Sequence, residues 1–386
     1  MEEWKEYKLK EVTSVLGDGI HGTPKYDDNG SVFFINGNNL ENGRIVIKDT
    51  TKRVSEREAE KYKKPLCDRT LMVSINGTLG NVARYNGEHC ILGKSACFFN
   101  VKEDFEKDFI YYVVNNQYFR NEIERLATGT TIKNVSLETM RNYSFLVPSL
   151  DIQRRIASIL SSLDDKIELN RKINANLEAQ AQALFKSWLN RCTEEVSIGD
   201  LSQNITDYSK CNCERVVLIN SSDVTEGHFE HHVLSENKNL KGHFKKRFQK
   251  GDILYSQVRP RNRHWGYCTF DADNYLASTQ LMVIRNKSDI LPSILLYQYM
   301  IDDKVWKEFT LKTETRSGTF PQGNYEDLSS IRVPFGTDVK EISDKLETIY
   351  SMIYTNEQES RRLASLRDAL LPRLMSGELK VNEIVL

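Results

Sequence analysis

The 386-residue chain contains no long apolar run, and its N-terminus has little hydrophobic character. No stretch approaches the roughly 18 consecutive apolar residues of a membrane span, and the mean hydropathy is −0.51. The first residues, MEEWKEYKLKEV, are charged and lack the apolar stretch of a signal peptide. We therefore expect a protein without a membrane span.

Cysteine pairs and an excess of one charge are also missing. The seven cysteines are odd in number and form no CxxC pair, which favours a reducing cytoplasm. The 53 lysines and arginines nearly balance the 54 acidic residues, so the formal net charge is −1. Because the whole chain does not attract nucleic acid electrostatically, any such site must depend on local basic patches.

Motifs for enzymatic chemistry are incomplete. The eight prolines include no Pro-Pro pair, which excludes the Asn/Asp-Pro-Pro-aromatic motif expected of a methyltransferase. The segment GEHCILGKS has five residues between its glycines, whereas a P-loop needs four. A possible zinc ligand set fits no standard spacing; it comprises Cys211, Cys213, His228, His231 and His232. We expect no catalytic residue, cofactor or metal, with a stand-alone methyltransferase or nuclease of degenerate motif as the alternative.

One long amphipathic phrase occurs twice in the chain. The segment VPSLDIQRRIASIL begins at Val147, and its counterpart begins at Val333, at an offset of 186 residues. Asn170 and Asn356 match at the same offset. Helical spacing alone explains matched Leu and Ile but not the shared Val-Pro start or the asparagine. We interpret the phrase as part of an internal duplication.

The duplication extends into the segments that precede the helices. VFFINGNNL resembles RVVLINSSDV, TLMVSINGT resembles DILYSQVRP, and ATGTTIKN resembles RSGTFPQGN. Alternating apolar runs such as RTLMVSI and QLMVIRN predict strands, while DFIYYVVNNQYFRNEIERLA and SILLYQYMIDDKVWKEF predict helices at equivalent places. The predicted organisation is a globular domain at 1–148, a helix at 149–190, a second domain at 193–335, a second helix at 336–377 and a tail at 378–386.

The two long helices have heptad-like seams. Apolar residues recur at alternating steps of four and three, which is typical of a coiled coil, so each helix is the simplest partner for the other. A pseudo-two-fold axis would make contacts reciprocal and bring Asn170 opposite Asn356 to fix the register. The same axis predicts the pairs Leu163 with Leu363, Ile156 with Leu370, and Leu177 with Ile349. A second apolar face is expected to remain for partner proteins; it comprises Ile159, Ile173, Phe185 and Trp188.

Four phrases together resemble a known family. DGIHGTPKY, SINGTLGNVA, VPSLDIQRRIASIL and LASLRDALLPRLMSGEL are similar to segments of the specificity (S) subunits of type I restriction–modification systems. The resemblance covers nearly the whole chain. The first helix start carries the family's acidic residue and glutamine as Asp151 and Gln153, whereas the second start, PFGTDVKEI, lacks them.

The resemblance implies an α+β fold with two similar mixed α/β target recognition domains separated by two long antiparallel helices. Each domain would read one part of a split double-stranded DNA site. The helices would act as spacer and dock two methyltransferase (M) subunits, nuclease–translocase (R) subunits would join, and the S subunit itself would have no catalytic role. A helix of roughly 38 residues spans about 57 Å, and a turn of B-DNA about 34 Å, which predicts unread base pairs between the half-sites. A pure assembly adaptor is a third interpretation.

Local basic and amide-bearing loops are the predicted DNA contacts. HFKKRFQKGD and RPRNRHW concentrate basic residues, since Lys and Arg bind phosphate and Arg also reads guanine. Asn and Gln side chains suit adenine edges. The predicted set is Lys25, Asn76, Thr78, Thr130, Thr131, Lys133, Asn134, Lys245, Lys246, Arg247, Gln257, Arg259, Arg261, Arg263, Arg316, Thr319 and Gln322.

Overall fold

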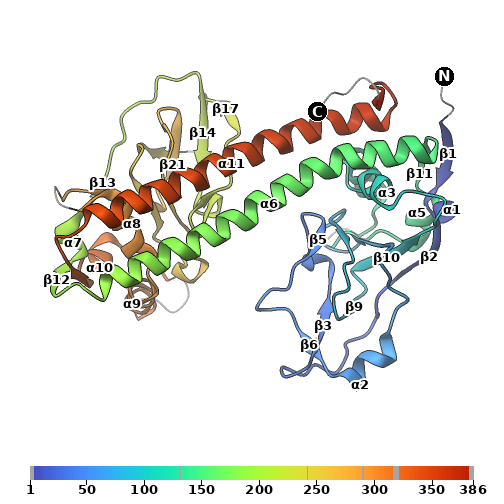
Figure 1. Ribbon diagram of the computed structural model, residues 1–386, viewed down its shortest axis with the longest axis horizontal. Helices are drawn as coiled ribbons and strands as arrows, with labels where there is room; N and C mark the ends of the chain where they lie inside the picture. The colour runs from blue at the N-terminus through green and yellow to red at the C-terminus, as the bar shows by residue number, and fades with distance from the viewer. Residues whose placement is uncertain (1–3, 130–131, 241, 289–290, 316–320, 382–386) are drawn as a thin grey trace. The chain divides into compact units, whose positions relative to one another are not determined.

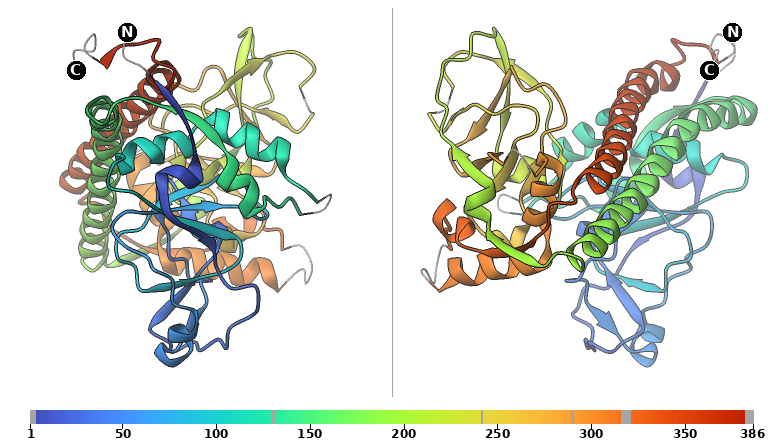
Figure 2. Two further views of the ribbon diagram at one scale, coloured as in Figure 1. Left: turned by 90° about the vertical axis from the view of Figure 1, so that its right-hand side faces the viewer. Right: turned by 60° about the vertical axis from the view of Figure 1, so that its left-hand side comes forward.

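The structure, a computed structural model, describes residues 4–129, 132–240, 242–288, 291–315 and 321–381. The chain divides into two compact units. Unit 1 comprises Met1–Glu168 with Ser360–Leu386, and unit 2 comprises Leu169–Glu359. The long helices α6 (Leu150–Leu189) and α11 (Lys340–Met375) each begin in one unit and end in the other (Figures 1 and 2). Within the described ranges, no helix has the length and apolar character needed to cross a bilayer.

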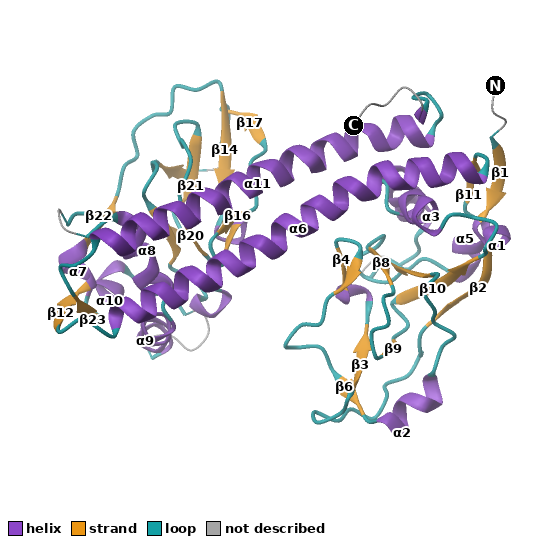
Figure 3. Ribbon diagram, in the orientation of Figure 1, coloured by secondary structure: helices purple, strands orange, loops and turns teal. Residues whose placement is uncertain are grey.

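Unit 1 is built on a four-stranded antiparallel sheet of order β2-β10-β7-β8. Every residue of its two central strands is buried, which explains their almost uninterrupted apolar sequences. A smaller sheet of order β6-β3-β9, a hairpin β4-β5 and a pair β1-β11 complete the strands (Figure 3). The strands are β1 (Lys5–Lys8), β2 (Thr13–Asp18), β3 (Val32–Ile35), β4 (Leu40–Glu41), β5 (Arg44–Ile45), β6 (Arg53–Val54), β7 (Thr70–Ser74), β8 (Val82–Arg84), β9 (Cys90–Leu92), β10 (Ala96–Val101) and β11 (Ser144–Val147).

Unit 2 repeats this plan with the sheet β13-β22-β19-β20. Its second sheet has one more strand, in the order β17-β14-β21-β18. As in unit 1, a short hairpin and a terminal strand pair accompany the sheets. The strands are β12 (Glu194–Ser197), β13 (Ser202–Ile205), β14 (Arg215–Ile219), β15 (Val224–Thr225), β16 (His228–Phe229), β17 (Leu234–Glu236), β18 (Phe244–Lys246), β19 (Ile253–Ser256), β20 (Trp265–Tyr267), β21 (Tyr275–Ser278), β22 (Leu281–Asn286) and β23 (Arg332–Phe335).

The helical segments predicted after each main sheet are both interrupted. Asn116 accepts a hydrogen bond from the Phe119 amide at 2.8 Å, and Asp302 accepts one from the Lys304 amide at 2.9 Å. Each side chain starts a new helix as an N-cap, so the chain turns at these residues. The helices are α1 (Leu9–Val12), α2 (Glu56–Ala59), α3 (Lys107–Val114), α4 (Gln117–Leu126) and α5 (Leu137–Asn142) in unit 1, and α7 (Ile198–Leu201), α8 (Ser293–Ile301), α9 (Asp303–Glu314) and α10 (Tyr325–Ser329) in unit 2; the 3-10 turns are η1 (Gly37–Asn39), η2 (Glu60–Tyr62), η3 (Ser221–Asp223) and η4 (Pro260–Asn262).

The small hairpins β4-β5 and β15-β16 are equivalent and contact equivalent residues. Their turns contain Gly43 and Gly227, both with positive φ. A Cβ atom at either glycine would lie 2.6 Å from a tyrosine hydroxyl, that of Tyr111 in unit 1 and that of Tyr297 in unit 2. Glycine is therefore required for the left-handed turn and for the close contact.

In unit 2, the second half of α6 packs antiparallel against the first half of α11. The indole Nε1 of Trp188 donates to the Asp338 carbonyl at 2.9 Å, and the Asn174 amide donates to the Ile353 carbonyl at 3.2 Å. Leu177 and Ile349, a predicted pair, belong to the same hydrophobic core. Residues later in α6 contact residues earlier in α11, as an antiparallel pair requires.

In unit 1, the first half of α6 packs with the second half of α11. Ile156 and Leu370, the second predicted pair, both contribute to the core of this unit. Of the third predicted pair, Leu163 is buried and Leu363 is half-buried.

The prediction of a second apolar face was wrong for two residues. Phe185 and Trp188 are each only 2% exposed and pack against Tyr299 in the core of unit 2. The heptad pattern cannot separate a face that meets another helix from one that meets the globular domain. Ile159 is half-buried against the core of unit 1, and Ile173 is 36% exposed.

The matched asparagines meet in the helix pair of unit 2. Asn170 is 1% exposed, and its amide donates to the Asn356 carbonyl at 3.3 Å and to Glu359 at 2.7 Å. The Asn356 amide donates in turn to the side-chain oxygen of Asn174 at 2.8 Å. A slip of either helix would break these bonds, which supports the proposal that the two asparagines fix the register.

This register can be tested by cross-linking. Cysteines placed at positions 170 and 356 are expected to form a disulfide on mild oxidation, because the two residues contact each other in the seam. Cysteines at 177 and 356 serve as the mismatched control, about two helical turns out of register. The readout is mass spectrometry of tryptic peptides; an unbridged 170–356 pair would place the pseudo-two-fold axis elsewhere.

A buried polar group in each unit connects the α3 or α8 helix with the long helices. In unit 1, the Tyr112 hydroxyl and the Arg367 guanidinium each donate to Asp164 at 2.6 Å. In unit 2, the residue 186 positions after Tyr112 is Gln298, and it donates to the Tyr350 hydroxyl at 2.8 Å. Tyr350 is itself the repeat equivalent of Asp164. The duplicated positions have therefore kept their contact while the residue types have changed together.

Arg367 also has an equivalent position in the other half of the repeat. Its equivalent in α6 is Ala181, which is fully buried in the core that Tyr350 packs against. The ion pair of Asp164 and Arg367 in unit 1 thus corresponds to Tyr350 and Ala181 in unit 2. A large and a small side chain fill the place of the two charged ones.

Candidate nucleic-acid interface

One end of the main sheet in unit 1 collects loops from distant parts of the sequence. Because the sheet is antiparallel, β2 and β7 end where β10 and β8 begin. The loop 75–81 follows β7 there, and the turn 93–95 precedes β10. The Ile75 amide donates to the Ser95 carbonyl at 3.0 Å, which holds the two loops together.

Residues 132–134 join the same end of unit 1. The Gly77 amide donates to the Lys133 carbonyl at 3.0 Å, and Asn76 forms a bridge with Asn134. The Asn76 side-chain amide donates to the Asn134 side-chain oxygen at 3.1 Å. The structure thus brings together four of the predicted residues, since Thr78 lies exposed in the same loop.

Unit 2 repeats the arrangement with different side chains. The Arg259 amide donates to the Pro321 carbonyl at 3.2 Å, and the Gly323 amide donates to the Gln257 carbonyl at 2.8 Å. Val258 and Gln322 form the bridge that corresponds to Asn76 and Asn134. Gln257 is half-buried, whereas Gln322 is exposed.

These hydrogen bonds revise the alignment of the two halves at this loop. Asn134 occupies the place of Gln322, and Ser136 occupies the place of Asn324. Ser136 and Asn324 cap the equivalent helices α5 and α10. An amide side chain therefore stands at the same bridge position in both units, while Asn324 serves as a helix cap.

The arginine loop of unit 2 has an uncommon backbone. Arg259 and Arg263 have φ values of 49° and 53°, on either side of η4. Non-glycine residues in the left-handed region cost about 1 kcal/mol or more each, so the surrounding contacts must hold them. The Trp306 indole donates to the Pro260 carbonyl at 2.9 Å, and the Arg263 guanidinium lies 4.1 Å from the Trp306 ring centre.

The three arginines of this loop have different surroundings. Arg263 is half-buried and also lies 3.3 Å from Asp303, so it anchors the loop on α9. Arg261 is exposed and bonds to both oxygens of Glu314, at 2.8 Å for one of them. These bonds raise the pKa of Arg261 and lower the pKa of Glu314. Arg259 is exposed and lies directly before η4.

The basic strand β18 approaches the same end of unit 2. The Arg247 amide donates to the Asp207 carbonyl at 2.8 Å, just after β13. The Lys245 ammonium lies 4.9 Å from the ring centre of Tyr208, which is 50% exposed. Lys245 and Arg247 therefore lie near the turn 278–280, because His243 accepts a bond from Thr279.

Lys246 points the other way. It is only 5% exposed, its ammonium donates to the Leu281 carbonyl at 2.7 Å, and burial lowers its pKa. A buried ammonium that is already bonded to a carbonyl cannot reach a DNA phosphate, so Lys246 is left out of the proposed interface.

Other predicted residues lie apart from these loops or outside the described residues. Lys25 is exposed, and its backbone amide donates to Glu58 at 3.0 Å, in the part of unit 1 that contains α2. Among the described residues, no hydrogen bond or ion pair connects Lys25 with the loop at 75–81. Thr130, Thr131, Arg316 and Thr319 lie outside the described residues.

Two further residues belong to the candidate interface but were missed in the sequence. Lys94 is exposed in the turn before β10, and its amide donates to the Ile20 carbonyl at 3.0 Å. Tyr208 presents an exposed ring beside Lys245. The position of Lys94 directly before a strand was a usable signal, whereas nothing in the sequence near Tyr208 separated it from other loop tyrosines.

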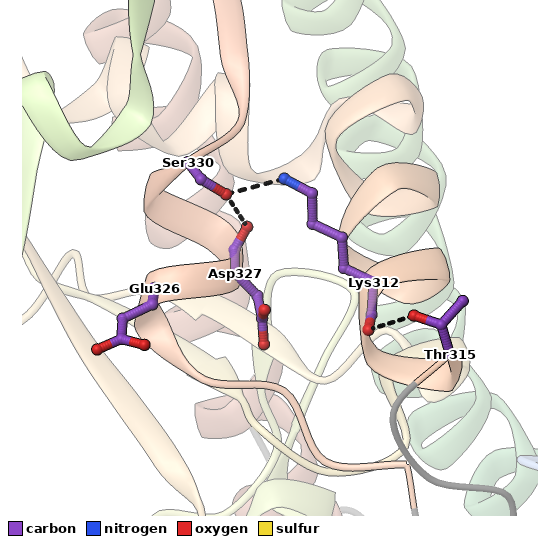
Figure 4. A pocket seen from close by; sticks show the side chains of 5 residues that line it. All are labelled: Lys312, Thr315, Glu326, Asp327 and Ser330. Atoms are coloured by element: carbon purple, nitrogen blue, oxygen red, sulfur yellow. Dashed lines mark hydrogen bonds between the residues drawn. The ribbon is translucent and has the colours of Figure 1, made fainter.

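A polar hollow of about 320 Å³ lies between the end of α9 and α10. Figure 4 shows its lining of Lys312, Thr315, Glu326, Asp327 and Ser330. The Lys312 ammonium donates to the Ser330 hydroxyl at 2.8 Å, and that hydroxyl donates to the Asp327 carbonyl at 3.0 Å. These bonds tie α9 to α10 and thus support the loop that bears Gln322.

The possible zinc ligands identified in the sequence do not form a metal site among the described residues. His228 lies between two glutamates, and both ring nitrogens of His232 are within bonding distance of Tyr275 and Phe229. Among the described residues, no group of three or more His, Cys, Asp or Glu side chains is arranged to hold a metal ion.

Two units of one plan, each with exposed polar loops at a sheet end and joined by a helix pair, define a duplicated recognition protein. The family model for the type I restriction modification DNA specificity domain matches residues 1–179 and again residues 194–364. The chain therefore belongs to the family of type I restriction–modification specificity subunits, as the sequence predicted.

Curated relatives carry the same description. The chain is 36% identical over 180 residues to the HindI specificity subunit of Haemophilus influenzae, an alignment that covers 46% of this chain and 39% of that protein. It is 21% identical over 421 residues to the MjaIX specificity subunit of Methanocaldococcus jannaschii, covering 99% of this chain and 95% of that protein.

A solved structure has the same fold. The type I restriction–modification S subunit from M. genitalium matches with a TM-score of 0.57 and 17% identity, covering 97% of this chain and 96% of that one. The predicted α+β class, with two similar mixed domains and two long antiparallel helices, is confirmed.

Proposed function

We propose that this chain reads a bipartite, asymmetric double-stranded DNA site. The observation that carries the proposal is the loop pair built twice at equivalent sheet ends, with Asn134 in one unit and Gln322 in the other at the same bridge position. Amides suit adenine edges, and the neighbouring lysines and arginines suit phosphates and guanine. Because the two loop pairs differ in sequence, the two half-sites differ.

The proposed roles of the segments follow the internal repeat. Residues 1–148 and 193–335 form the two target recognition domains, and the helices at 149–190 and 336–377 form the spacer. The chain itself has no catalytic role in this proposal and acts in the cytoplasm.

The helices are also the proposed docking surface for two methyltransferase (M) subunits, with restriction (R) subunits joining the complex. Exposed apolar side chains on these helices support such docking; they are Leu169, Ile173 and Met352 in unit 2 and Leu366 in unit 1.

Methylome sequencing tests the proposed function. Cells that express this chain with its M subunit are expected to methylate two short, different sequences separated by a fixed number of unread base pairs. Cells with the M subunit alone are the control. A continuous methylated motif, or none that depends on this chain, would contradict the proposal.

The enzyme alternative has a separate test. A stand-alone methyltransferase must bind S-adenosylmethionine, so isothermal titration of the isolated chain is expected to give no binding, while the complex with the M subunit binds. Binding by the isolated chain would favour the alternative.

A further inference from the structure

His228 lies between two carboxylates that come from different helices. It is the first residue of β16, in the small hairpin of unit 2. Its Nδ1 atom lies 2.8 Å from Glu357 on α11, and its Nε2 atom lies 3.3 Å from Glu178 on α6. One imidazole therefore connects the globular part of unit 2 with both long helices.

The two neighbouring carboxylates favour a charged ring. A neutral imidazole has one N–H and could donate to only one of the carboxylates, whereas the imidazolium donates to both. The bonds to Glu178 and Glu357 raise the pKa of His228 to about 10, despite partial burial. Since this pKa is higher than the unfolded value of about 6.5, the contact is fully present below neutral pH and is lost only as the pH rises through 10.

Unit 1 has a cation at the equivalent place. Arg44 begins β5 in the matching hairpin and lies 2.6 Å from Glu168 on α6. Different residue types thus form the same kind of contact between hairpin and helix in both units. A contact between hairpin and long helix is therefore common to both units, although its residues differ.

We infer that His228 is a positioning residue that holds the second recognition domain at one angle on the helix pair and thereby sets the length of the DNA spacer. This inference rests on the proposed function, and it names the residue that fixes the spacing. The hydrogen bond from Gln298 to Tyr350 reaches α11 alone, whereas His228 contacts one carboxylate on each long helix and so opposes rotation of the domain about either one.

The inference predicts that a weakened contact broadens spacer choice. In the purified complex with its M subunits, the wild type should methylate the native spacer much faster than spacers one base pair longer or shorter. His228→Gln keeps size and polarity but removes the charge, and we expect the preference for the native spacer to fall roughly five-fold, the scale of one lost ion pair that is partly exposed to solvent.

Three further variants make the result specific. His228→Arg should restore the preference, because Arg44 makes the corresponding contact in unit 1. Glu357→Gln removes one of the two bonds without touching the hairpin and should have an intermediate effect. His231→Gln, the same substitution three residues along, should leave spacer choice unchanged.

The outcomes separate the two ideas. If the wild type shows no split motif, the proposed function fails. If the wild type is selective and His228→Gln slows methylation equally on all three spacers, His228 only stabilises the fold and the positioning role is wrong. Failure of His228→Gln to fold shifts the decision to Glu357→Gln, whose unchanged spacer preference would likewise overturn the inference.

Discussion

Replacing Asp164 with alanine is expected to lower the free energy of unfolding of unit 1 by about 3 kcal/mol. The side chains of Asp164 and Arg367 are 22% and 28% exposed, so the guanidinium would lose the less exposed of its two carboxylate partners and keep only Asp368. The Tyr112 hydroxyl would lose its acceptor at the same time. Differential scanning calorimetry and hydrogen exchange of the α3 amides would measure the change.

The equivalent residues of unit 2 provide a compensating variant for unit 1. Combining Tyr112→Gln, Asp164→Tyr and Arg367→Ala copies the corresponding trio of unit 2, and stability is expected to return to within about 1 kcal/mol of the wild type. A triple variant as unstable as Asp164→Ala would refute the equivalence of the two sites. A loss of less than about 1 kcal/mol in the single variant would mean that water already solvates the ion pair.

Alanine at Arg259, Arg261 and Arg263 together is expected to weaken DNA binding by the assembled complex about 100-fold or more. Each lost contact with guanine or phosphate is worth roughly 1–3 kcal/mol, and each lost phosphate contact makes the salt dependence shallower by about one unit. Competition with oligonucleotides altered in one half-site should show that only the half read by unit 2 loses specificity.

The single variants of this loop should behave differently. Arg259→Ala is expected to reduce affinity without a loss of stability, because the side chain is exposed. Arg263→Ala should also remove the guanidinium from the Trp306 ring and from Asp303, and so lower the thermal stability of unit 2. Alanine at Arg191, Lys340 and Lys345, near the start of α11, removes the same charge and serves as the control. Equal affinity and salt slope in the triple variant and the wild type would assign the arginines to a solvated face.

The sequence was sufficient for the architecture because the repeat is long and its period is unambiguous. Heptad spacing predicted α6 and α11, and the alternating apolar runs predicted the central strands, since burial against a helix or a sheet leaves a regular pattern in the chain. The matched Asn170 and Asn356 indicated where the two helices meet, because an amide inside an apolar seam is conspicuous. The family could be inferred from four phrases that keep their order.

Tertiary structure alone decided which basic residues face outward. Lys245 and Lys246 are adjacent and chemically identical, but successive side chains of a strand point to opposite faces, so one lies beside Tyr208 and the other is buried. The same holds for the arginines, because Trp306 and Glu314 lie on α9, some fifty residues later in the chain. The sequence by itself determined the elements and the family; packing between distant segments determined which basic side chains are exposed.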